Sequence, residues 1–360
     1  MSDGLEGVIA AETVLSSVDG EAGALIIRGH ALDELAGRVR YEAVVRLLFE
    51  GFFAGSPTDL TAALGAARME VFDEIAALDA KLLARPPVDA LRALMARLTD
   101  GDELEIALRL VAAPAVFTPA VVRAQAGQAP VAPDAALPHS ADMLRMFRGA
   151  PASPAEAAAL DAYLTTVSDH GLNASTFAAR VTASTRAGLT SAVLAGLSAL
   201  KGPLHGGAPG PVIEMLDAIG APPNARPWLE AALARGDRLM GFGHRVYRVR
   251  DPRADALKAA VRRLDLATER RPGRLALAEA VEAAALEILK AHKPGRPLDT
   301  NVEFYTALLL EALGIPPAAF TCIFATGRVA GWIAHAREQL AGGRLIRPQS
   351  HYVGPTPRAA

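Results

Sequence analysis

Apolar residues along this chain recur mainly with the spacing of amphipathic α-helices. Two segments show it most clearly, Tyr41–Phe53 and Val88–Leu98, each of which places an apolar stripe on one helical face. The second stripe ends at Thr99-Asp100-Gly101, a typical helix stop. The pattern predicts a mainly α-helical fold of roughly twenty short helices. Similar apolar segments follow at residues 104–111, 188–200 and 316–340.

Local signals define where several of these helices start and stop. Ser153-Pro154-Ala155-Glu156 is a capping box with proline at the first helical position, and its helix delivers Asp169-His170 to the C-terminal end. Asn173 can cap the next helix, and Ser56-Pro57 is expected to open an earlier one. Three prolines within residues 127–140 forbid a continuous helix, which predicts an exposed connection there.

A small β-hairpin is predicted near the N-terminus, at residues 7–28. Its apolar residues flank a turn region that contains Asp19-Gly20 and Gly23. These residues are Val8, Ile9, Val14 and Leu15 before the turn, and Leu25, Ile26 and Ile27 after it.

Composition and charge limit the possible partners. The chain has 360 residues, 51% of them hydrophobic, a formal net charge of −2 and a pI of about 6.5. A net charge this close to zero gives a weak overall electrostatic field, which attracts neither nucleic acid nor an anionic membrane. Neither is therefore expected as a partner. The single cysteine, Cys322, excludes a disulfide framework. Because no apolar leader follows the acidic start Met1–Glu6, a cytoplasmic protein is expected.

The segment Met240–Arg253 has the most concentrated candidate chemistry, with two glycines, one histidine and four arginines. Gly241 and Gly243 allow the backbone to approach a ligand closely or to take a positive φ. His244 and the arginines suit the recognition of carboxylate or phosphate oxygens. A solvated basic loop with a structural histidine explains this composition equally well, so the other motifs have to decide.

Four polar positions stand out by their settings: Asp169-His170, His205, His244 and Glu303. Each has a structural alternative, because a histidine at a helix end often hydrogen-bonds locally and a first-turn glutamate complements the helix dipole. The three histidines are each more than thirty residues apart and form no His-x₃-His pair, so no metal site is predicted. The sequence also lacks G-x-S-x-G, which argues against a Ser-His-Asp hydrolase.

Several motifs occur together in an order that is more specific than any one of them. They are Asp169-His-Gly-Leu-Asn-Ala-Ser-Thr176, Leu204-His-Gly-Gly-Ala208, Gly241-Phe-Gly-His-Arg-Val-Tyr247 with Asp251-Pro-Arg253, Asn301-Val-Glu-Phe-Tyr305, and Gly327-Arg-Val-Ala-Gly-Trp332 with Arg347-Pro348. This set resembles the signature segments of the citrate synthase family, and the resemblance covers nearly the whole chain.

The resemblance implies an enzyme that joins acetyl-CoA to oxaloacetate and hydrolyses the thioester to citrate and CoA, with acetyl-CoA as co-substrate and no cofactor. It implies that Glu303 is the base that removes the methyl proton, that His205 donates to the thioester oxygen, and that His244 polarises the ketone. The implied oxaloacetate ligands are His170, Arg253, Arg328 and Arg347, and weaker matches for the CoA phosphates are Arg248 and Lys293.

The resemblance also implies a two-domain helical fold with its active site in the cleft. The large domain would comprise residues 1–204 and 310–360, and the small domain residues 205–309. Domain closure would exclude water from the reaction. A homodimer is expected, in which Arg347 of one subunit reaches the site of the other.

Two positions depart from the family pattern. Glu303 stands where Asp is usual, which moves the carboxylate by about one bond length, and Gly171 replaces a common Glu. Three alternatives stay open: a 2-methylcitrate synthase that uses propionyl-CoA, a citryl-CoA lyase, and a catalytically silent homologue that acts as a binding or regulatory protein. One methyl group is worth only ~1–3 kcal/mol of discrimination, so the sequence leaves the acyl donor open.

Overall fold

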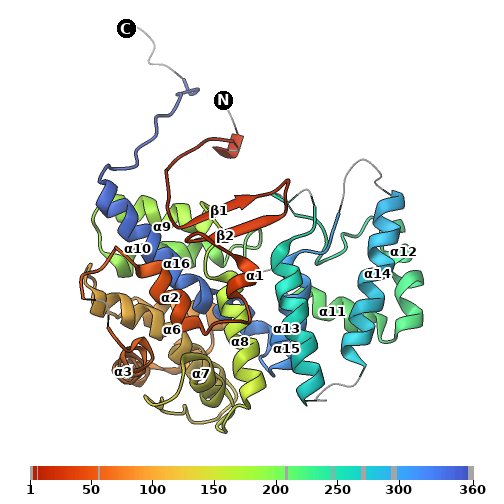
Figure 1. The fold of residues 1–360 in the computed structure, drawn as a ribbon, viewed down its shortest axis with the longest axis horizontal. Helices are drawn as coiled ribbons and strands as arrows, with labels where there is room; N and C mark the ends of the chain where they lie inside the picture. The colour runs from red at the N-terminus through yellow and green to blue at the C-terminus, as the bar shows by residue number, and fades with distance from the viewer. Residues whose placement is uncertain are drawn as a thin grey trace.

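The mainly α-helical prediction is confirmed. The structure, a computed structural model, describes residues 3–5, 7–55, 57–206, 210–244, 246–247, 249–268, 273–292 and 298–355. These ranges contain sixteen α-helices, four short 3-10 helices and one three-stranded sheet (Figure 1). The α-helices are α1 (Leu32–Leu35), α2 (Tyr41–Phe49), α3 (Leu60–Phe72), α4 (Ala80–Leu83), α5 (Pro87–Met95), α6 (Leu104–Gln125), α7 (His139–Arg148), α8 (Pro154–Val167), α9 (Ala174–Ser184), α10 (Leu189–Leu200), α11 (Gly210–Ile219), α12 (Ala225–Ala234), α13 (Pro252–Thr268), α14 (Arg274–His292), α15 (Val302–Ala312) and α16 (Phe320–Gly342).

The N-terminal hairpin is present but shorter than predicted. Strand β1 (Ser16–Asp19) pairs antiparallel with β2 (Ala24–Ile27), and β3 (His30–Ala31) adds a short third strand. The prediction that Val8, Ile9, Val14 and Leu15 belong to the hairpin strand is wrong. The turn after Asp19 sets Ser16 opposite Ile27, so these residues lie before the strand, where Leu15 is buried and the other three are exposed.

Helix starts follow the local capping chemistry, with one correction. Ser153 and Glu156 form the expected capping box of α8, and the Asn173 side chain accepts hydrogen bonds from the first turn of α9. The predicted start at Ser56-Pro57 is wrong, because α3 begins at Leu60 and the Asp59 carboxylate accepts from the Ala62 amide instead. Ser56 itself lies outside the described residues.

Two long helices, α6 and α16, are deeply buried and pack against each other (Figure 1). Every residue from Leu110 to Val121 is buried in α6, and every residue from Cys322 to Ala336 in α16. Among the described residues, α6 alone is long and apolar enough to cross a membrane, but 72% of its apolar window is buried inside the protein. It packs as a core helix.

Glycines allow α16 to lie directly against the end of α8. A Cβ atom on Gly327 would lie 2.9 Å from the Leu164 carbonyl oxygen, and one on Gly331 would lie 2.2 Å from that of Ser168. Because no side chain separates these backbones, the residues that follow each glycine are carried to the turn after α8. That turn contains Asp169 and His170.

The outer helices α11, α12 and α14 lie on the side of the molecule opposite α3 and α7 (Figure 1). Helices α13 and α15 lie between them and α8, and α13 packs against both α8 and α15. Helices α13 and α15 both therefore pack against α8.

Candidate active site

The two glycines of the Met240–Arg253 segment are required by a close backbone approach. Gly241 and Gly243 have φ of 85° and 80°, and Cβ atoms there would lie 2.8 Å from Phe304 and 2.9 Å from Leu298 side-chain atoms. The Gly243 amide donates to the Asp299 carbonyl at 2.7 Å, so this segment pairs with the chain that enters α15. This pairing brings His244 beside the first turn of α15.

The His244 ring is fixed by the backbone that follows it. Its Nδ1 accepts from the amides of Val246 at 3.0 Å and Tyr247 at 3.1 Å, which places the ring proton on Nε2. Nε2 faces Nη2 of Arg253 at 3.1 Å. Two donors therefore converge where one ligand oxygen could accept from both. Burial, and then the charge of Arg253, lower the pKa of His244 to about 4, so the ring is neutral at pH 7.

Arg253 is buried and held by Asp251. Its Nε lies 3.0 Å from Asp251 Oδ1 and its Nη2 lies 2.9 Å from Oδ2. The same carboxylate accepts from the Val302 amide at 3.1 Å, which joins the arginine to the start of α15. Asp251 thus sets the position of Arg253 relative to Glu303.

Arg328 differs from Arg253 because no carboxylate within the described ranges forms an ion pair with it. Its side chain is buried in α16, at 1% exposure, where Nε donates to the Val167 carbonyl at 2.6 Å and the guanidinium lies 5.0 Å from the Phe324 ring centroid. Burial lowers the pKa of Arg328 to about 10, although the charge of Asp169 opposes the shift. A buried cation of this kind is costly, and a bound anion would offset the cost.

His170 lies between these groups. Its Nε2 is 3.1 Å from the Tyr247 hydroxyl, and its ring centroid is 6.0 Å from that of His244. Burial, followed by the charges of Arg253 and Arg328, holds the pKa of His170 well below its ordinary value. A neutral imidazole beside two cations can donate to an oxygen ligand without adding positive charge.

His205 is held from behind by a serine. It lies on the turn after α10, with Nε2 at 2.9 Å from the Ser175 hydroxyl oxygen. Trp332 Nε1 donates to that same oxygen at 3.1 Å. The Ser175 hydroxyl donates to Asn173 Oδ1 at 2.7 Å, but the Ser175 amide donates to Nε2 at 3.4 Å, so Nε2 can accept and the ring proton can be carried by Nδ1. Burial and then Arg328 lower the pKa of His205 to about 4, so this imidazole is also neutral at pH 7.

Glu303 lies in the first turn of α15, directly after the capping residue Asn301, whose side chain accepts from the Glu303 amide at 3.0 Å. Burial raises the pKa of Glu303 to about 7, against the opposing effect of Arg253. A carboxylate with this proton affinity can both take up and release a proton near neutral pH, as a general base must.

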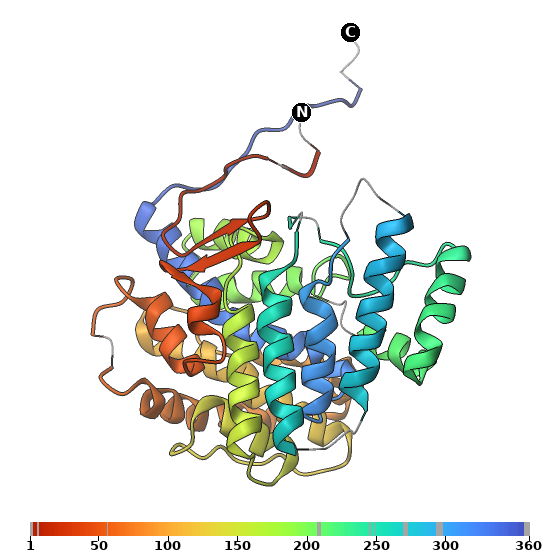
Figure 2. The same ribbon diagram turned by 45° about the vertical axis from the view of Figure 1, so that its right-hand side comes forward.

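Six of the seven predicted catalytic and oxaloacetate residues are linked in one cluster by these contacts and by electrostatic interactions: His170, His205, His244, Arg253, Arg328 and Glu303. The seventh, Arg347, is exposed in the extended tail after α16, which leaves the body of the molecule (Figure 2). Arg248 and Lys293 lie outside the described residues.

Three positioning residues had no predicted role. Ser175 and Trp332 support His205, and Asp251 supports Arg253. All three lie within the quoted motifs, but only their contacts reveal what they do. The described part of the chain contains no group of three or more His, Cys, Asp or Glu side chains that could hold a metal ion.

Known proteins similar to this chain cover almost all of it. The family model described as "Citrate synthase, C-terminal domain" matches residues 4–349. A putative citrate synthase 2 of Mycobacterium tuberculosis is 39% identical over 99% of this chain and 94% of the relative. The citrate synthase of Haloferax volcanii is 38% identical over 98% and 95%. A 2-methylcitrate synthase of M. tuberculosis is 35% identical over 98% and 90%.

Two solved structures that resemble this chain are also citrate synthases. Citrate synthase from Pyrobaculum aerophilum superposes with a TM-score of 0.86 at 33% identity, covering 99% of this chain and 93% of that one. Citrate synthase from Thermoplasma acidophilum, solved as a ternary complex with carboxymethyl coenzyme A and oxaloacetate, gives a TM-score of 0.86 at 28% identity, covering 100% of this chain and 98% of that one.

Proposed function

Because the chain belongs to the citrate synthase family, and is an acyltransferase of that family, we propose that it uses acetyl-CoA as its acyl donor and oxaloacetate as its acceptor. The observation that supports oxaloacetate as the acceptor is the state of Arg328. Its guanidinium is buried, forms no ion pair with a carboxylate among the described residues, and lies close to a second buried arginine and neutral histidines. A small dicarboxylate supplies the missing negative charge. The Thermoplasma acidophilum relative was solved with oxaloacetate and a CoA analogue, which supports this choice.

Oxaloacetate would be held by charge-assisted hydrogen bonds. Arg328 and Arg253 would bind its carboxylates, with His170 as a neutral donor beside them. The ketone oxygen would accept from His244 Nε2, at the position where the nearby Arg253 Nη2 also points. Both donors pull electron density from the ketone carbon, which makes that carbon more electrophilic.

Glu303 would start the reaction by removing a proton from the acetyl-CoA methyl group. His205 would donate from Nδ1 to the thioester oxygen as negative charge develops there, and Ser175 would hold the ring in that tautomer. The methyl carbon then attacks the ketone carbon, and the new alkoxide is stabilised by His244 and Arg253. Water finally hydrolyses the thioester, which releases citrate and CoA.

The proposed domain division fits the origin of these side chains. His170 and Arg328 come from the proposed large domain, residues 1–204 and 310–360. His205, His244 and Glu303 come from the proposed small domain, residues 205–309. A site between the two would close around both substrates and exclude water until the carbon–carbon bond has formed. We place the enzyme in the cytoplasm, with acetyl-CoA as co-substrate and without a cofactor.

Propionyl-CoA is the second candidate acyl donor, because a 2-methylcitrate synthase is 35% identical to this chain. We favour acetyl-CoA since the relatives at 39% and 38% identity are a putative citrate synthase and a citrate synthase. The test is kcat/KM for each acyl-CoA at saturating oxaloacetate. We expect acetyl-CoA to be favoured by about tenfold or more, since one methyl is worth ~1–3 kcal/mol. A preference for propionyl-CoA would reverse the assignment.

The pH dependence of the reaction should follow Glu303. As a base it must be ionised, and its pKa of about 7 means that the protonated fraction grows as pH falls through that value. We therefore expect kcat/KM for acetyl-CoA to level off above pH 7 and to fall by about tenfold per unit well below it. His205 and His244, with pKa values of about 4, and His170, whose pKa is held well below its ordinary value, stay neutral over this range. A profile that is flat between about pH 5.5 and 8 contradicts the assignment.

The enzyme is proposed to be a homodimer in which Arg347 completes the neighbouring oxaloacetate site. Arg347→Ala should raise the KM for oxaloacetate by roughly 10–100-fold, the effect of losing a charge-assisted contact, while light scattering still reports a dimer. Arg344→Ala, in the same exposed tail, is the matched control and should leave KM unchanged. A fully active monomer at assay concentration would contradict the proposal.

A further inference from the structure

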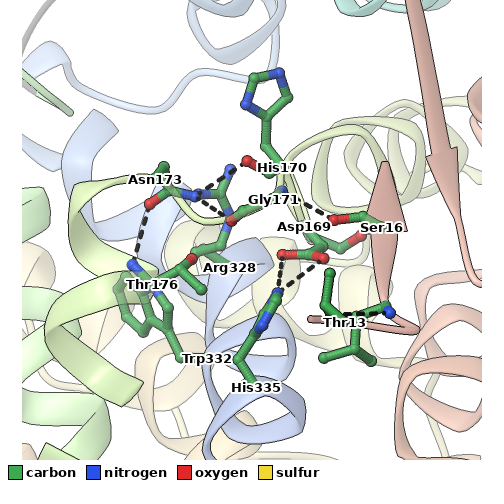
Figure 3. A network of polar contacts seen from close by, with 12 residues as sticks. Thr13, Ser16, Asp169, His170, Gly171, Asn173, Thr176, Arg328, Trp332 and His335 are labelled. Carbon is green, nitrogen blue, oxygen red and sulfur yellow. Dashed lines mark hydrogen bonds and ion pairs between the residues drawn. The ribbon is translucent and has the colours of Figure 1, made fainter. Parts of the chain in front are cut away.

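One face of α16 supports the candidate site at three successive levels. Arg328, Trp332 and His335 are spaced by four and three residues, so their side chains project from the same side of the helix. Arg328 lies in the site, and Trp332 holds Ser175 behind His205. His335 reaches Asp169, as Figure 3 shows. The first two have roles in the proposed reaction. His335, which is fully buried, has none.

The contacts of His335 fix its tautomer. Its Nδ1 lies 3.1 Å from Nη1 of Arg180, and a guanidinium can only donate, so Nδ1 accepts and the proton is on Nε2. Nε2 lies 3.2 Å from both carboxylate oxygens of Asp169. His335 therefore donates from Nε2 and holds Asp169 through both oxygens.

Asp169 is the anion with the largest electrostatic effect on Arg328, yet the two side chains do not form an ion pair. The Asp169 carboxylate is fully buried and is followed directly in the chain by His170. His335 fixes the position of this carboxylate on one side. On the other side, the Ser16 hydroxyl oxygen accepts from the Gly171 amide at 2.9 Å, which fixes the backbone two residues after Asp169. Without the His335 donor, a buried carboxylate would gain most by turning to the nearest buried cation.

We propose that His335 is a positioning residue that holds the Asp169 carboxylate away from Arg328, and so keeps the Arg328 guanidinium available for a substrate carboxylate. The inference rests on the proposed role of Arg328 in binding oxaloacetate. His335 itself touches no substrate. It prevents the Asp169 carboxylate from occupying the position beside Arg328 that a substrate carboxylate would take.

Further contacts keep this arrangement rigid. Arg180 forms an ion pair with Glu338 at 2.5 Å, one turn beyond His335 on α16. The other Glu338 oxygen accepts from the Val14 amide at 2.8 Å and from the Thr13 hydroxyl at 3.2 Å. The segment before β1 therefore covers the outer end of the network, and the Arg180 side chain cannot turn away from His335 without breaking these contacts.

The test compares His335→Leu, which removes the donor, with His335→Gln, whose amide nitrogen can still donate to Asp169. For His335→Leu we expect the KM and Kd for oxaloacetate to rise ~10–100-fold, with the KM for acetyl-CoA within about threefold of wild type. His335→Gln should restore most of the oxaloacetate affinity. The control is His139→Leu, a fully buried histidine next to Arg68, which should lower the Tm without changing either KM.

A double variant separates positioning from a purely structural role. If Asp169 occupies Arg328 in His335→Leu, then adding Asp169→Asn removes the competing charge and should recover oxaloacetate affinity by about tenfold relative to the single variant. A structural role predicts that the double variant is worse than either single one. That result, or an unchanged oxaloacetate Kd in His335→Leu, overturns the inference.

The measurement of Kd by calorimetry also separates this inference from the function on which it rests. If the wild type binds oxaloacetate and His335→Leu binds it equally well, the positioning role alone is wrong. If the wild type does not bind oxaloacetate, the proposed function fails and the inference fails with it. Should His335→Leu not fold, His335→Asn takes its place, because its shorter amide does not reach Asp169 as Nε2 does.

Discussion

Glu303→Gln is expected to lower kcat by ~10²–10⁴ while oxaloacetate binds almost normally. The substitution keeps the shape of the side chain but removes the carboxylate that accepts the methyl proton. If Glu303 only complemented the dipole of α15, it would contribute ~0.3–1 kcal/mol to stability and glutamine would replace it with little effect on turnover. The raised pKa of about 7 and the half-buried position at the site favour the catalytic role.

Two further variants complete this experiment. Glu303→Asp restores the residue that is usual in the family but leaves the carboxylate about one bond length short, so partial activity below wild type is expected. Glu156→Gln changes a first-turn glutamate of α8 that belongs to a capping box, and it should affect only stability. If Glu303→Gln turns over within a few-fold of wild type, the base lies elsewhere.

Arg328→Met is expected to reduce kcat/KM for oxaloacetate by ~10²–10³, since breaking a buried charge pair with a ligand costs about 2–5 kcal/mol. The same change should leave the Tm of the free enzyme unchanged or raise it. Methionine fills a similar volume without a charge, and the guanidinium that it removes has no carboxylate ion pair within the described residues. Lower activity without lower stability is the mark of a residue kept for function.

Arg68→Met provides the matched control. Arg68 is also completely buried, but its Nε lies 2.8 Å from Asp142 and its Nη2 donates to the Leu137 carbonyl at 2.7 Å. Its removal takes away one of the two arginine partners of the buried Asp142 carboxylate, which keeps Arg145 at 2.8 Å, and should cost about 1–3 kcal/mol of stability without a change in the KM for oxaloacetate. An Arg328→Met enzyme with normal oxaloacetate KM, or one destabilised as much as Arg68→Met, contradicts the substrate role of Arg328.

What the sequence predicted well was local in origin. The capping box at Ser153 and the cap at Asn173 depend on side chains within three residues of the amides that they bind, so the sequence alone contains the whole interaction. The prediction of strand residues at Val8 and Ile9 failed because apolar character was read without the cross-strand register, which the turn after Asp19 determines.

The candidate site was predictable as a set of residues that lie together, but not as a set of contacts. His205, His244 and Glu303 were recognised through motifs, and each motif is contiguous in sequence. The contacts that hold them are long-range: Trp332 reaches Ser175 across 157 positions, and His335 reaches Asp169 across 166. No spacing rule connects such positions in one sequence, since only the packing of α16 against α8 and α9 brings them together.

The departure at Gly171 has a conformational basis. Its φ is +60°, a value that costs little for glycine and much more for other residues, and its amide donates to Ser16 in β1. A Cβ atom there would lie 3.4 Å from the Val18 side chain. The N-terminal hairpin therefore packs directly on the residue after His170.

The most direct test of the central claim is thiol release by the wild-type enzyme at pH 8 with oxaloacetate and acetyl-CoA, with the product identified and Glu303→Gln run in parallel. The account predicts CoA release that requires both substrates, formation of citrate in equal amount, and a rate lower by ~10²–10⁴ in the variant. Folded enzyme that releases no thiol with either acetyl-CoA or propionyl-CoA, or that hydrolyses acetyl-CoA without oxaloacetate, would contradict it.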